Sequence, residues 1–335
     1  MYIKLFEDFN DIDKSKSQDI DSICKLYGIE NWTINKDGSV DVDGNVDISE
    51  EPLVKLPLIF GEVTGYFKCY GIGMVSLEGC PTKVGGDFDC SLNQLITLEG
   101  APKEVGGDFD CSNNELVSLK GSPRKIGGGF WCNSNILTTL NGGPTEVGGI
   151  FSCSKNLLTT LDGCTNKVSS FFCTYNELTT LNGGPTEVGG SFECNDNQLV
   201  NLKGAPSKVG GNFNCSHNKL TSLEGSPYEV GGVFDCGSNK LKTLEGSPKK
   251  VSRYFWCSFN QLNTFECESE VGEGFHWKGN PIYEVYRLFP DYKSYLDSLD
   301  YNYLRGDKIV KMRFKEALEE FNIEMPKSIE GYGWI

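Results

Sequence analysis

Hydrophobic and polar positions follow one pattern that recurs about every 21 residues along most of the chain. One copy reads VGGDFDCSLNQLITLEGAP at positions 84–102, and the next reads VGGDFDCSNNELVSLKGSP at positions 105–123. In each copy a phenylalanine and a cysteine two residues apart share one face of an extended chain, and leucines usually follow five and eight residues after the cysteine. The pattern predicts one short strand per copy, with Phe and Cys facing a common core. The cysteines at this position are 21 residues apart, with a single step of 20: Cys69, Cys90, Cys111, Cys132, Cys153, Cys173, Cys194, Cys215, Cys236 and Cys257.

A coil of this length is too short to bury its own Phe, Cys and Leu side chains. Stacking successive coils about 4.8 Å apart as a parallel sheet buries all of them in continuous columns. An asparagine stands three residues after the cysteine in each copy from Asn93 to Asn260, and its amide has donors and an acceptor for backbone groups that the bending chain leaves unpaired. The sequence therefore predicts a mainly β repeat solenoid of about twelve turns.

The motif F-x-C-x-x-N-x-L-x-x-L resembles the core of leucine-rich repeats, and Asn114 and Leu116 match that motif position by position. The resemblance covers residues 46–282 and implies a right-handed solenoid with a parallel β-sheet on its concave face, few helices in the repeats, and a role in recognition. Glycine stands where the first leucine of the family normally occurs, so the resemblance does not predict the structure of the convex side. The phrase SLEGSPxxVGGxFxCSxNxL is also similar to repeat proteins of large tailed bacteriophages and some marine bacteria.

The two ends of the chain depart from the repeat, so we expect three parts. Residues 1–45 are predicted to form a helix and a hairpin that cap the first coil, residues 46–280 the solenoid, and residues 281–335 a helical cap with a break at Pro290. The N-terminal helical face is Ile20, Ile23, Cys24 and Tyr27. The two C-terminal stripes are Tyr292, Tyr295, Leu296 and Leu299, and Val310, Phe314, Ala317, Leu318 and Phe321.

The charge is strongly negative, with a formal net charge of −15. Lys and Arg form no cluster, so we expect no nucleic-acid partner. No run of 18 apolar residues and no signal-like N-terminus is found, so we expect no membrane partner and a cytoplasmic location, either in a host cell or, for a viral protein, in a phage particle. Leu5-Phe6-Glu7 fits the L-x-E pattern cut by head-maturation proteases of T4-like phages, and an ordinary amphipathic helix also explains it.

The inventory of reactive groups favours a protein without catalytic activity or cofactors. Ten of the 14 cysteines occupy one repeat position, where we expect small buried core residues rather than disulfides or metal ligands. The two histidines, His217 and His276, have no nucleophile motif beside them. An acidic run near the N-terminus suggests a calcium loop, but no glutamate closes a twelve-residue loop, so we predict no metal site. The residues of that run are Asn35, Asp37, Asp41 and Asp43.

Outward-facing positions of the predicted sheet begin acidic and then become polar with scattered aromatics. Aromatic side chains anchor protein interfaces or sugar rings, and aspartates on neighbouring strands repel one another unless a basic partner or a cation lies between them. We therefore expect a protein partner. A basic surface on that partner, a bound cation or simple solubility would explain the acidic positions. Glycan binding through Trp131 and Trp256 and a structural role in a phage particle are the alternative functions. Coil 161–181 is one residue short, which indicates either a shaped binding surface or repeat drift. The candidate residues are Asp87, Asp89, Asp108, Asp110, Trp131, Phe172, Tyr175, Glu193, Asp235, Tyr254, Trp256 and His276.

Overall fold

The computed structural model describes residues 16–49, 52–53, 55–263, 267–281, 283, 304–305, 308–309 and 333–334. Two compact units are distinguished, and each is described by itself. The first unit comprises residues 1–176 with 183–185, and the second comprises residues 177–182 with 186–335. Leu5-Phe6-Glu7 and the two C-terminal helical stripes lie outside the described residues.

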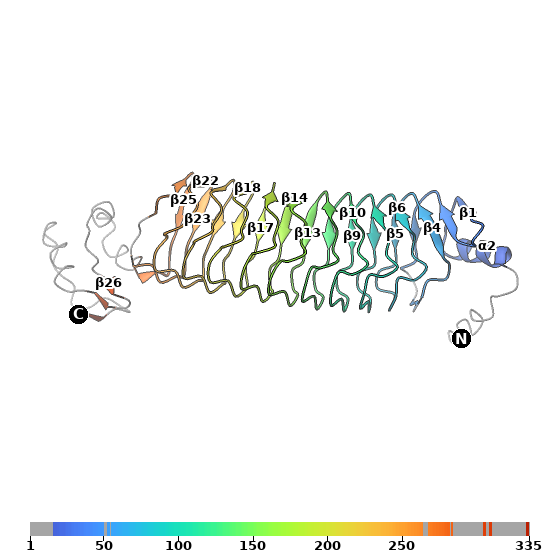
Figure 1. Cartoon of the computed structure of the whole chain (residues 1–335), viewed down its shortest axis with the longest axis horizontal. Coiled ribbons are helices and arrows are strands. Elements are labelled where there is room, and N and C mark those ends of the chain that lie inside the picture. The colour runs from blue at the N-terminus through green and yellow to red at the C-terminus, as the bar shows by residue number, and fades with distance from the viewer. Residues whose placement is uncertain are drawn as a thin grey trace. The chain divides into compact units, whose positions relative to one another are not determined.

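Each repeat contributes a short strand that contains its phenylalanine, and these strands pair in parallel within each unit (Figure 1). Equivalent residues of successive coils face one another, as Phe88 faces Phe109. We call this array the Phe–Cys sheet; its twelve strands are joined by eleven turns, close to the number predicted. In the first unit the strands are β3 (Val46–Asp47), β5 (Phe67–Lys68), β7 (Phe88–Asp89), β9 (Phe109–Asp110), β11 (Phe130–Trp131), β13 (Ile150–Ser152) and β15 (Ser170–Phe172), and in the second β17 (Phe192–Glu193), β19 (Phe213–Asn214), β21 (Phe234–Asp235), β23 (Tyr254–Trp256) and β25 (Gly274–His276).

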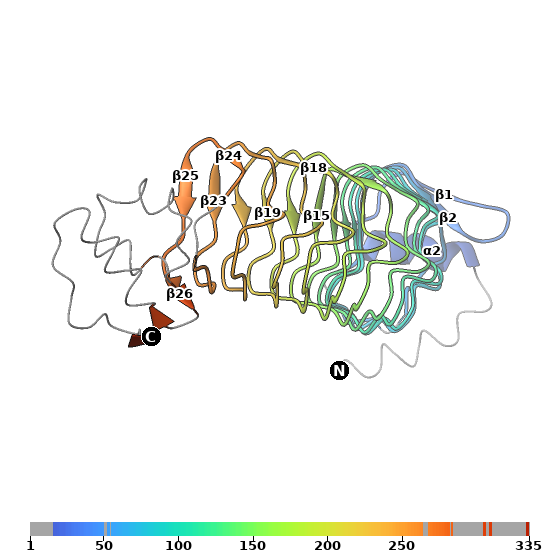
Figure 2. The same ribbon diagram turned by 60° about the vertical axis from the view of Figure 1, so that its left-hand side comes forward.

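The residues before the glycine pairs form a second set of parallel strands, which the sequence did not predict. Its strands in the first unit are β4 (Phe60–Val63), β6 (Lys83–Val84), β8 (Glu104–Val105), β10 (Lys125–Ile126), β12 (Glu146–Val147) and β14 (Lys167–Val168), and in the second β16 (Glu187–Val188), β18 (Lys208–Val209), β20 (Glu229–Val230), β22 (Lys250–Val251) and β24 (Glu270–Val271). We call these strands together the Lys/Glu sheet; backbone pairing divides them into one group that ends at β12 and a second group from β14 to β24. Figure 2 shows β18 and β24 of this array together with β19, β23 and β25 of the Phe–Cys sheet.

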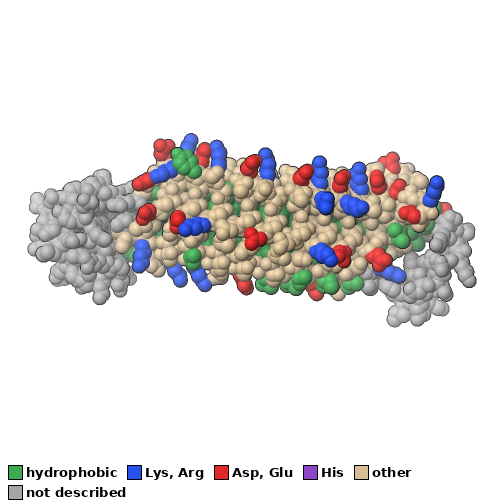
Figure 3. Space-filling model, viewed as in Figure 1, with side chains coloured by type: hydrophobic (Ala, Val, Ile, Leu, Met, Phe, Trp, Pro, Cys, Tyr) green, Lys and Arg blue, Asp and Glu red, His purple; other side chains and the backbone are tan. Residues whose placement is uncertain are grey.

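Charges along the Lys/Glu sheet alternate without interruption, from Glu62 and Lys83 to Lys250 and Glu270. Ion pairs join neighbouring coils, such as Lys125 Nζ to Glu146 Oε2 at 3.7 Å and Lys208 Nζ to Glu229 Oε2 at 2.9 Å. Figure 3 shows acidic and basic side chains interspersed along the edge where these strands lie. Each exposed pair adds a few tenths of a kcal/mol, so the alternation mainly avoids repulsion between coils.

The core consists of the columns that the repeat predicts. Phenylalanine rings of neighbouring coils lie 5.0 to 5.8 Å apart between centroids, as between Phe88 and Phe109 at 5.2 Å. The repeat cysteines and the two leucines of each coil, such as Leu116 and Leu119, are fully buried beside them. Because every column runs through successive coils, each coil depends on its neighbours for burial.

The asparagine column performs the predicted structural role. The Asn114 amide donates to the carbonyl oxygens of Cys90 at 3.1 Å, Cys111 at 3.1 Å and Ser112 at 3.2 Å, and its Oδ1 accepts from Leu95 N at 3.0 Å. One side chain therefore pairs backbone groups of its own coil and of the coil before. The same bonds recur in successive coils within each unit.

Glycine is required where successive coils approach most closely. A Cβ atom on Gly127 would lie 2.1 Å from the carbonyl oxygen of Gly106, and one on Gly106 would lie 2.1 Å from that of Gly85. Such distances are well inside van der Waals contact, so a side chain at either position would push the coils apart.

Helix α2 (Lys16–Leu26) and a hairpin of β1 (Trp32–Ile34) and β2 (Val40–Val42) precede the coils. Ile20, Ile23 and Cys24 are buried, which agrees with the predicted helical face. The structure adds strands that the helical pattern of the C-terminal segment did not predict, namely β26 (Leu304–Arg305), β27 (Lys308–Ile309) and β28 (Gly333–Trp334). The boundaries at 45/46 and 280/281 stay predictions.

All 14 cysteines are free thiols, and the ten of the repeat column have no exposed surface. Burial raises the pKa of the Cys164 thiol to about 12, and burial followed by the Asp21 charge raises that of Cys24 to about 11. Thiol reagents attack the thiolate form. The ten thiols of the column are inaccessible to such reagents, and the Cys24 and Cys164 thiols are protonated at neutral pH.

We therefore expect a thiol-specific reagent such as DTNB at pH 8 to react with few cysteines of the native protein. Denaturant without reductant should then release close to 14 thiols per chain. Absorbance of the released reagent measures both numbers. Rapid reaction of most native thiols would contradict the buried column, and a total well below 14 after denaturation would indicate disulfides.

Candidate functional site

The residue before each repeat cysteine points outward from the Phe–Cys sheet and faces its equivalent on the next strand. In the first unit Asp89 pairs with Asp110, which pairs with Trp131, and the row continues through Ser152 to Phe172. In the second unit the row comprises Glu193, Asn214, Asp235, Trp256 and His276. The structure thus brings Asp89, Asp110, Trp131 and Phe172 onto one face in the first unit, and Glu193, Asp235, Trp256 and His276 onto one face in the second.

The aspartates of this row also have a structural role that sequence reasoning missed. Asp89 Oδ1 accepts from the backbone N–H of Ser91 at 3.0 Å, and Asp110 Oδ1 accepts from that of Ser112 at 2.8 Å. Asp235 accepts in the same way from Gly237 N at 2.8 Å. Each carboxylate stabilises the turn that follows its strand. The signal was present as an Asp two residues before Ser in the phrase DCS.

Asp87 and Asp108 lie at the start of their strands and connect successive coils. Asp87 Oδ1 accepts from Asp108 N at 2.8 Å, and Asp108 Oδ1 accepts from Gly129 N at 2.6 Å. These hydrogen bonds to backbone donors stabilise neighbouring carboxylates without a cation or a basic partner. The acidic group is therefore weaker evidence for a basic partner than its sequence suggests.

Burial is the main influence on the carboxyl groups of the row. It raises the pKa of Asp110, against the effect of the Ser112 hydrogen bonds, and the charges of Asp89 and Asp108 raise it further. Burial likewise raises the pKa of Asp235 and Glu193, while the Gly237 N–H lowers that of Asp235. The predicted repulsion between aspartates is present, but desolvation outweighs it.

The three aromatic candidates of the first unit occupy different positions. Trp131 is half-buried, and its indole lies across Gly129, where an added Cβ would be 2.8 Å from Nε1. Phe172 is half-buried on β15, outward from the buried Phe171. Tyr175 is exposed on the following turn, at φ 54°, so it lies beyond the sheet face.

Tyr254, Trp256 and His276 form one aromatic group on β23 and β25. The His276 ring lies edge-on to Tyr254 with centroids 5.3 Å apart and edge-on to Trp256 at 5.8 Å. Trp256 is nevertheless 40% exposed. Mutual contacts hold the three rings in place while leaving the indole available to a ligand.

The side chains of the acidic run near the N-terminus are hydrogen-bonded within the chain. Asp37 accepts from Ser39, Asp41 accepts from Glu62 N at 2.7 Å, and Asp43 accepts from Thr64 Oγ1 at 2.9 Å. Asn35 donates to Ser39 Oγ at 3.1 Å. Within the described part of the chain, no three His, Cys, Asp or Glu side chains converge as metal ligands.

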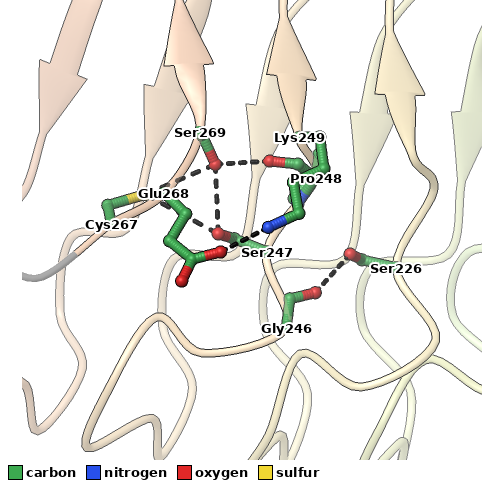
Figure 4. Close-up of polar contacts among 8 residues, drawn as sticks. All are labelled: Ser226, Gly246, Ser247, Pro248, Lys249, Cys267, Glu268 and Ser269. Carbon is green, nitrogen blue, oxygen red and sulfur yellow. Dashed lines mark hydrogen bonds and ion pairs between the residues drawn. The ribbon is translucent and has the colours of Figure 1, made fainter.

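A polar cluster surrounds the partly exposed Cys267, where the last coils become irregular (Figure 4). The Ser269 hydroxyl donates to Pro248 O at 2.5 Å, its oxygen lies 3.0 Å from Ser247 Oγ, and the Cys267 thiol donates to Ser269 Oγ at 3.3 Å. Lys249 and Glu268 form an ion pair beside it. The hydroxyls pair backbone and neighbouring groups, and Glu268 is paired with Lys249, so the cluster connects coils.

Sequence reasoning also missed apolar side chains on the turns after the Phe–Cys strands, because turn positions are usually assigned to solvent. Leu92, Ile96 and Val117 are at least half exposed there. Their signal was the recurrence of apolar residues two, four or six positions after the cysteine.

No protein-family model matches the chain. No curated protein matches it either. Among solved structures the fold is similar to YopM from Yersinia enterocolitica WA-314, with 20% sequence identity and a TM-score of 0.48 over 71% of this chain and 55% of that one. The chain thus spans about half the length of that protein. It is also similar to the leucine-rich effector protein YopM from Yersinia pestis, with 14% identity and a TM-score of 0.42 over 83% of this chain and 88% of that one.

The repeats of the structure themselves are like leucine-rich repeats, with short parallel strands and one inward asparagine per coil. Neither of the two similar structures comes from a bacteriophage, and the resemblance to phage and marine bacterial proteins stays a prediction. None of the helices described is long and apolar enough to span a bilayer. The predicted cytoplasmic location and the predicted lack of catalysis and cofactors stay predictions.

Proposed function

We propose that this protein is a binding scaffold that holds a partner protein against the outward face of the Phe–Cys sheet. The observation that carries the proposal is the aromatic group of Tyr254, Trp256 and His276, in which the His276 ring contacts the other two and Trp256 stays 40% exposed. Rigid aromatic side chains bury a large area at low entropic cost, and they dominate the energetics of protein interfaces.

The neighbouring polar side chains support the same proposal. Asp235 faces Trp256 across the strands, and Asn214 faces Asp235. Each of these polar side chains accepts a backbone N–H, so its position is fixed before a partner arrives. An aromatic anchor beside ordered hydrogen-bonding groups is the usual composition of a protein interface.

Replacing Trp131 and Trp256 together by alanine should abolish capture of the partner from a native cell lysate, while the fold persists. Quantitative mass spectrometry of the captured proteins, followed by a binding measurement with the purified partner, gives the result. The matched control is Tyr228→Ala, which removes a 68% exposed aromatic ring at the Lys/Glu sheet. Capture of the same partner by both variants with equal affinity would refute the proposal.

Glycan binding is the second candidate, since an exposed indole also packs against sugar rings. The exposed Trp256 favours it. Tryptophan fluorescence on a glycan array separates the two functions: a change that requires Trp256 would assign this face to carbohydrate, and no change would exclude glycans as the ligand.

A further inference from the structure

Six apolar side chains lie exposed on the turns that follow the Phe–Cys strands of the first unit, on a surface different from the one proposed above. We define the apolar ridge as these residues. Leu92 is 58% exposed and Ile96 is 60% exposed. Figure 3 shows hydrophobic side chains gathered along the lower edge of the molecule in the region of β5 to β13. The apolar ridge consists of Val75, Leu92, Ile96, Val117, Ile136 and Leu157.

Backbone hydrogen bonds hold these turns in register, so the ridge is one strip rather than scattered residues. Ile136 N donates to Leu116 O at 3.1 Å, and Leu157 N donates to Leu137 O at 3.0 Å. Thr138 N donates to Val117 O at 3.3 Å. Leu92 and Ile96 lie in the same coil, and the ridge residues of successive coils are separated by about one coil spacing, about 4.8 Å.

The fold itself does not require apolar residues at these positions. Most coils of the second unit place polar or basic side chains at these repeat positions, namely Gln198, Lys219, Thr221, Lys240 and Lys242, whereas Val200 and Phe259 are apolar and exposed there. Leu92 also has a φ of 56°, a conformation that costs a side chain of its kind about 1 kcal/mol and that Asn113 and Ser134 occupy in the next coils. Exposed apolar side chains without a packing role indicate contact with another molecule.

The spacing of the ridge side chains indicates whether an α-helix or a β-strand of the other molecule binds there. Apolar side chains on one face of an α-helix recur about every 5.4 Å, so they stay within about 2.4 Å of the ridge side chains over four coil steps. Same-face residues of a strand recur about every 6.7 Å and drift out of step by about 8 Å over the same distance. A helix of about 13 residues matches the length of the ridge.

The charged residues around the ridge indicate the sign of the charge that the helix carries. Glu115 lies within the ridge, and Asp89 and Asp110 lie on the adjacent outward row. Of the basic residues on these turns, Lys120 is paired with Glu99 at 2.7 Å, and Lys155 lies within the ridge, two residues before Leu157. The chain carries a net charge of −15, which repels both an anionic membrane and a second copy and attracts a basic segment.

We propose that the apolar ridge binds a basic amphipathic helix of a partner protein, with the apolar stripe of the helix on the ridge and its Lys or Arg side chains toward the flanking carboxylates. This mode of recognition uses the helix period for register and the charges for orientation. The proposal concerns a different surface from the aromatic face, so either can hold without the other.

The probe is a synthetic helical peptide of about 13 residues, with leucines at helical spacing and lysines elsewhere. A peptide of the same composition, with leucine and lysine alternating in the period of a strand, is the control for charge. Fluorescence anisotropy with the full chain should show at least about tenfold tighter binding of the helical peptide. The variant with Leu92→Ser, Ile96→Ser and Val117→Ser should weaken that binding at least about tenfold.

Val200→Ser is the matched control, because Val200 is also half exposed and occupies the same repeat position in the second unit. It should leave peptide binding unchanged, as should Trp131→Ala with Trp256→Ala, and circular dichroism should show that every variant is folded. Equal binding of the two peptides, or undiminished binding by the ridge variant, would overturn the proposal. So would ridge-dependent binding to phosphatidylcholine–phosphatidylglycerol vesicles, or a ridge-dependent dimer in analytical ultracentrifugation.

Discussion

Replacing Phe171 by alanine is expected to lower the free energy of unfolding by about 4 kcal/mol. Phe171 is fully buried in the phenylalanine column, with its ring 5.5 Å from that of Phe151. Its removal leaves a cavity that the coils on either side have little freedom to fill, because backbone hydrogen bonds fix their separation. Urea denaturation followed by circular dichroism measures the change.

The adjacent Phe172 provides the matched control. It belongs to the same strand but points outward and is only half-buried. Phe172→Ala removes the same number of atoms, and we expect it to cost under about 1 kcal/mol. Equal destabilisation by the two substitutions would contradict the assignment of the inward and outward faces of β15.

The second large effect is expected from Asn114→Leu, which should lower the free energy of unfolding by about 3 kcal/mol. The leucine occupies a similar volume but neither donates nor accepts. It leaves the Leu95 N–H without its acceptor at 3.0 Å, and it removes the donor to Cys90 O and Cys111 O. Because these groups are buried, their desolvation is no longer compensated. Urea denaturation and hydrogen exchange of the Leu95 amide report the loss.

Asn113 precedes Asn114 directly and serves as its control. Its side chain lies outside the core and donates only to Ser112 Oγ at 3.3 Å, and Ser134 occupies the same position in the next coil with a similar φ. Asn113→Ser should therefore change the free energy of unfolding by about 0.5 kcal/mol or less. A result in which this substitution costs as much as Asn114→Leu would show that the inward amide is not what stabilises the coil.

The inward columns could be predicted from the sequence because a solenoid converts sequence period into spatial neighbourhood. Cys111 and Cys132 become neighbours simply because they are 21 residues apart. The Lys/Glu sheet was not predicted, since each coil contributes only a two-residue strand with one buried Val or Ile. Its signal lay in the alternation of Lys and Glu over two coils, which a search for a one-coil period does not detect.

The sequence predicted where the outward residues of the candidate site lie, but it predicted only part of what their side chains do. Trp256 and His276 lie on one outward row, as the strand period requires. The aspartates were expected to need a basic partner, yet Asp110 and Asp235 use backbone N–H donors of their own turns. Whether a carboxylate is paired depends on turn geometry, which the strand period does not specify.

The alternation along the Lys/Glu sheet constrains how such a chain changes length. Loss or gain of one coil, for example the coil that carries Lys125, would place Glu104 directly beside Glu146 and set like charges next to each other at the new junction. Loss or gain of two adjacent coils keeps a Lys beside every Glu. Duplication in units of two coils is therefore the route by which this array grows or shortens without an electrostatic penalty.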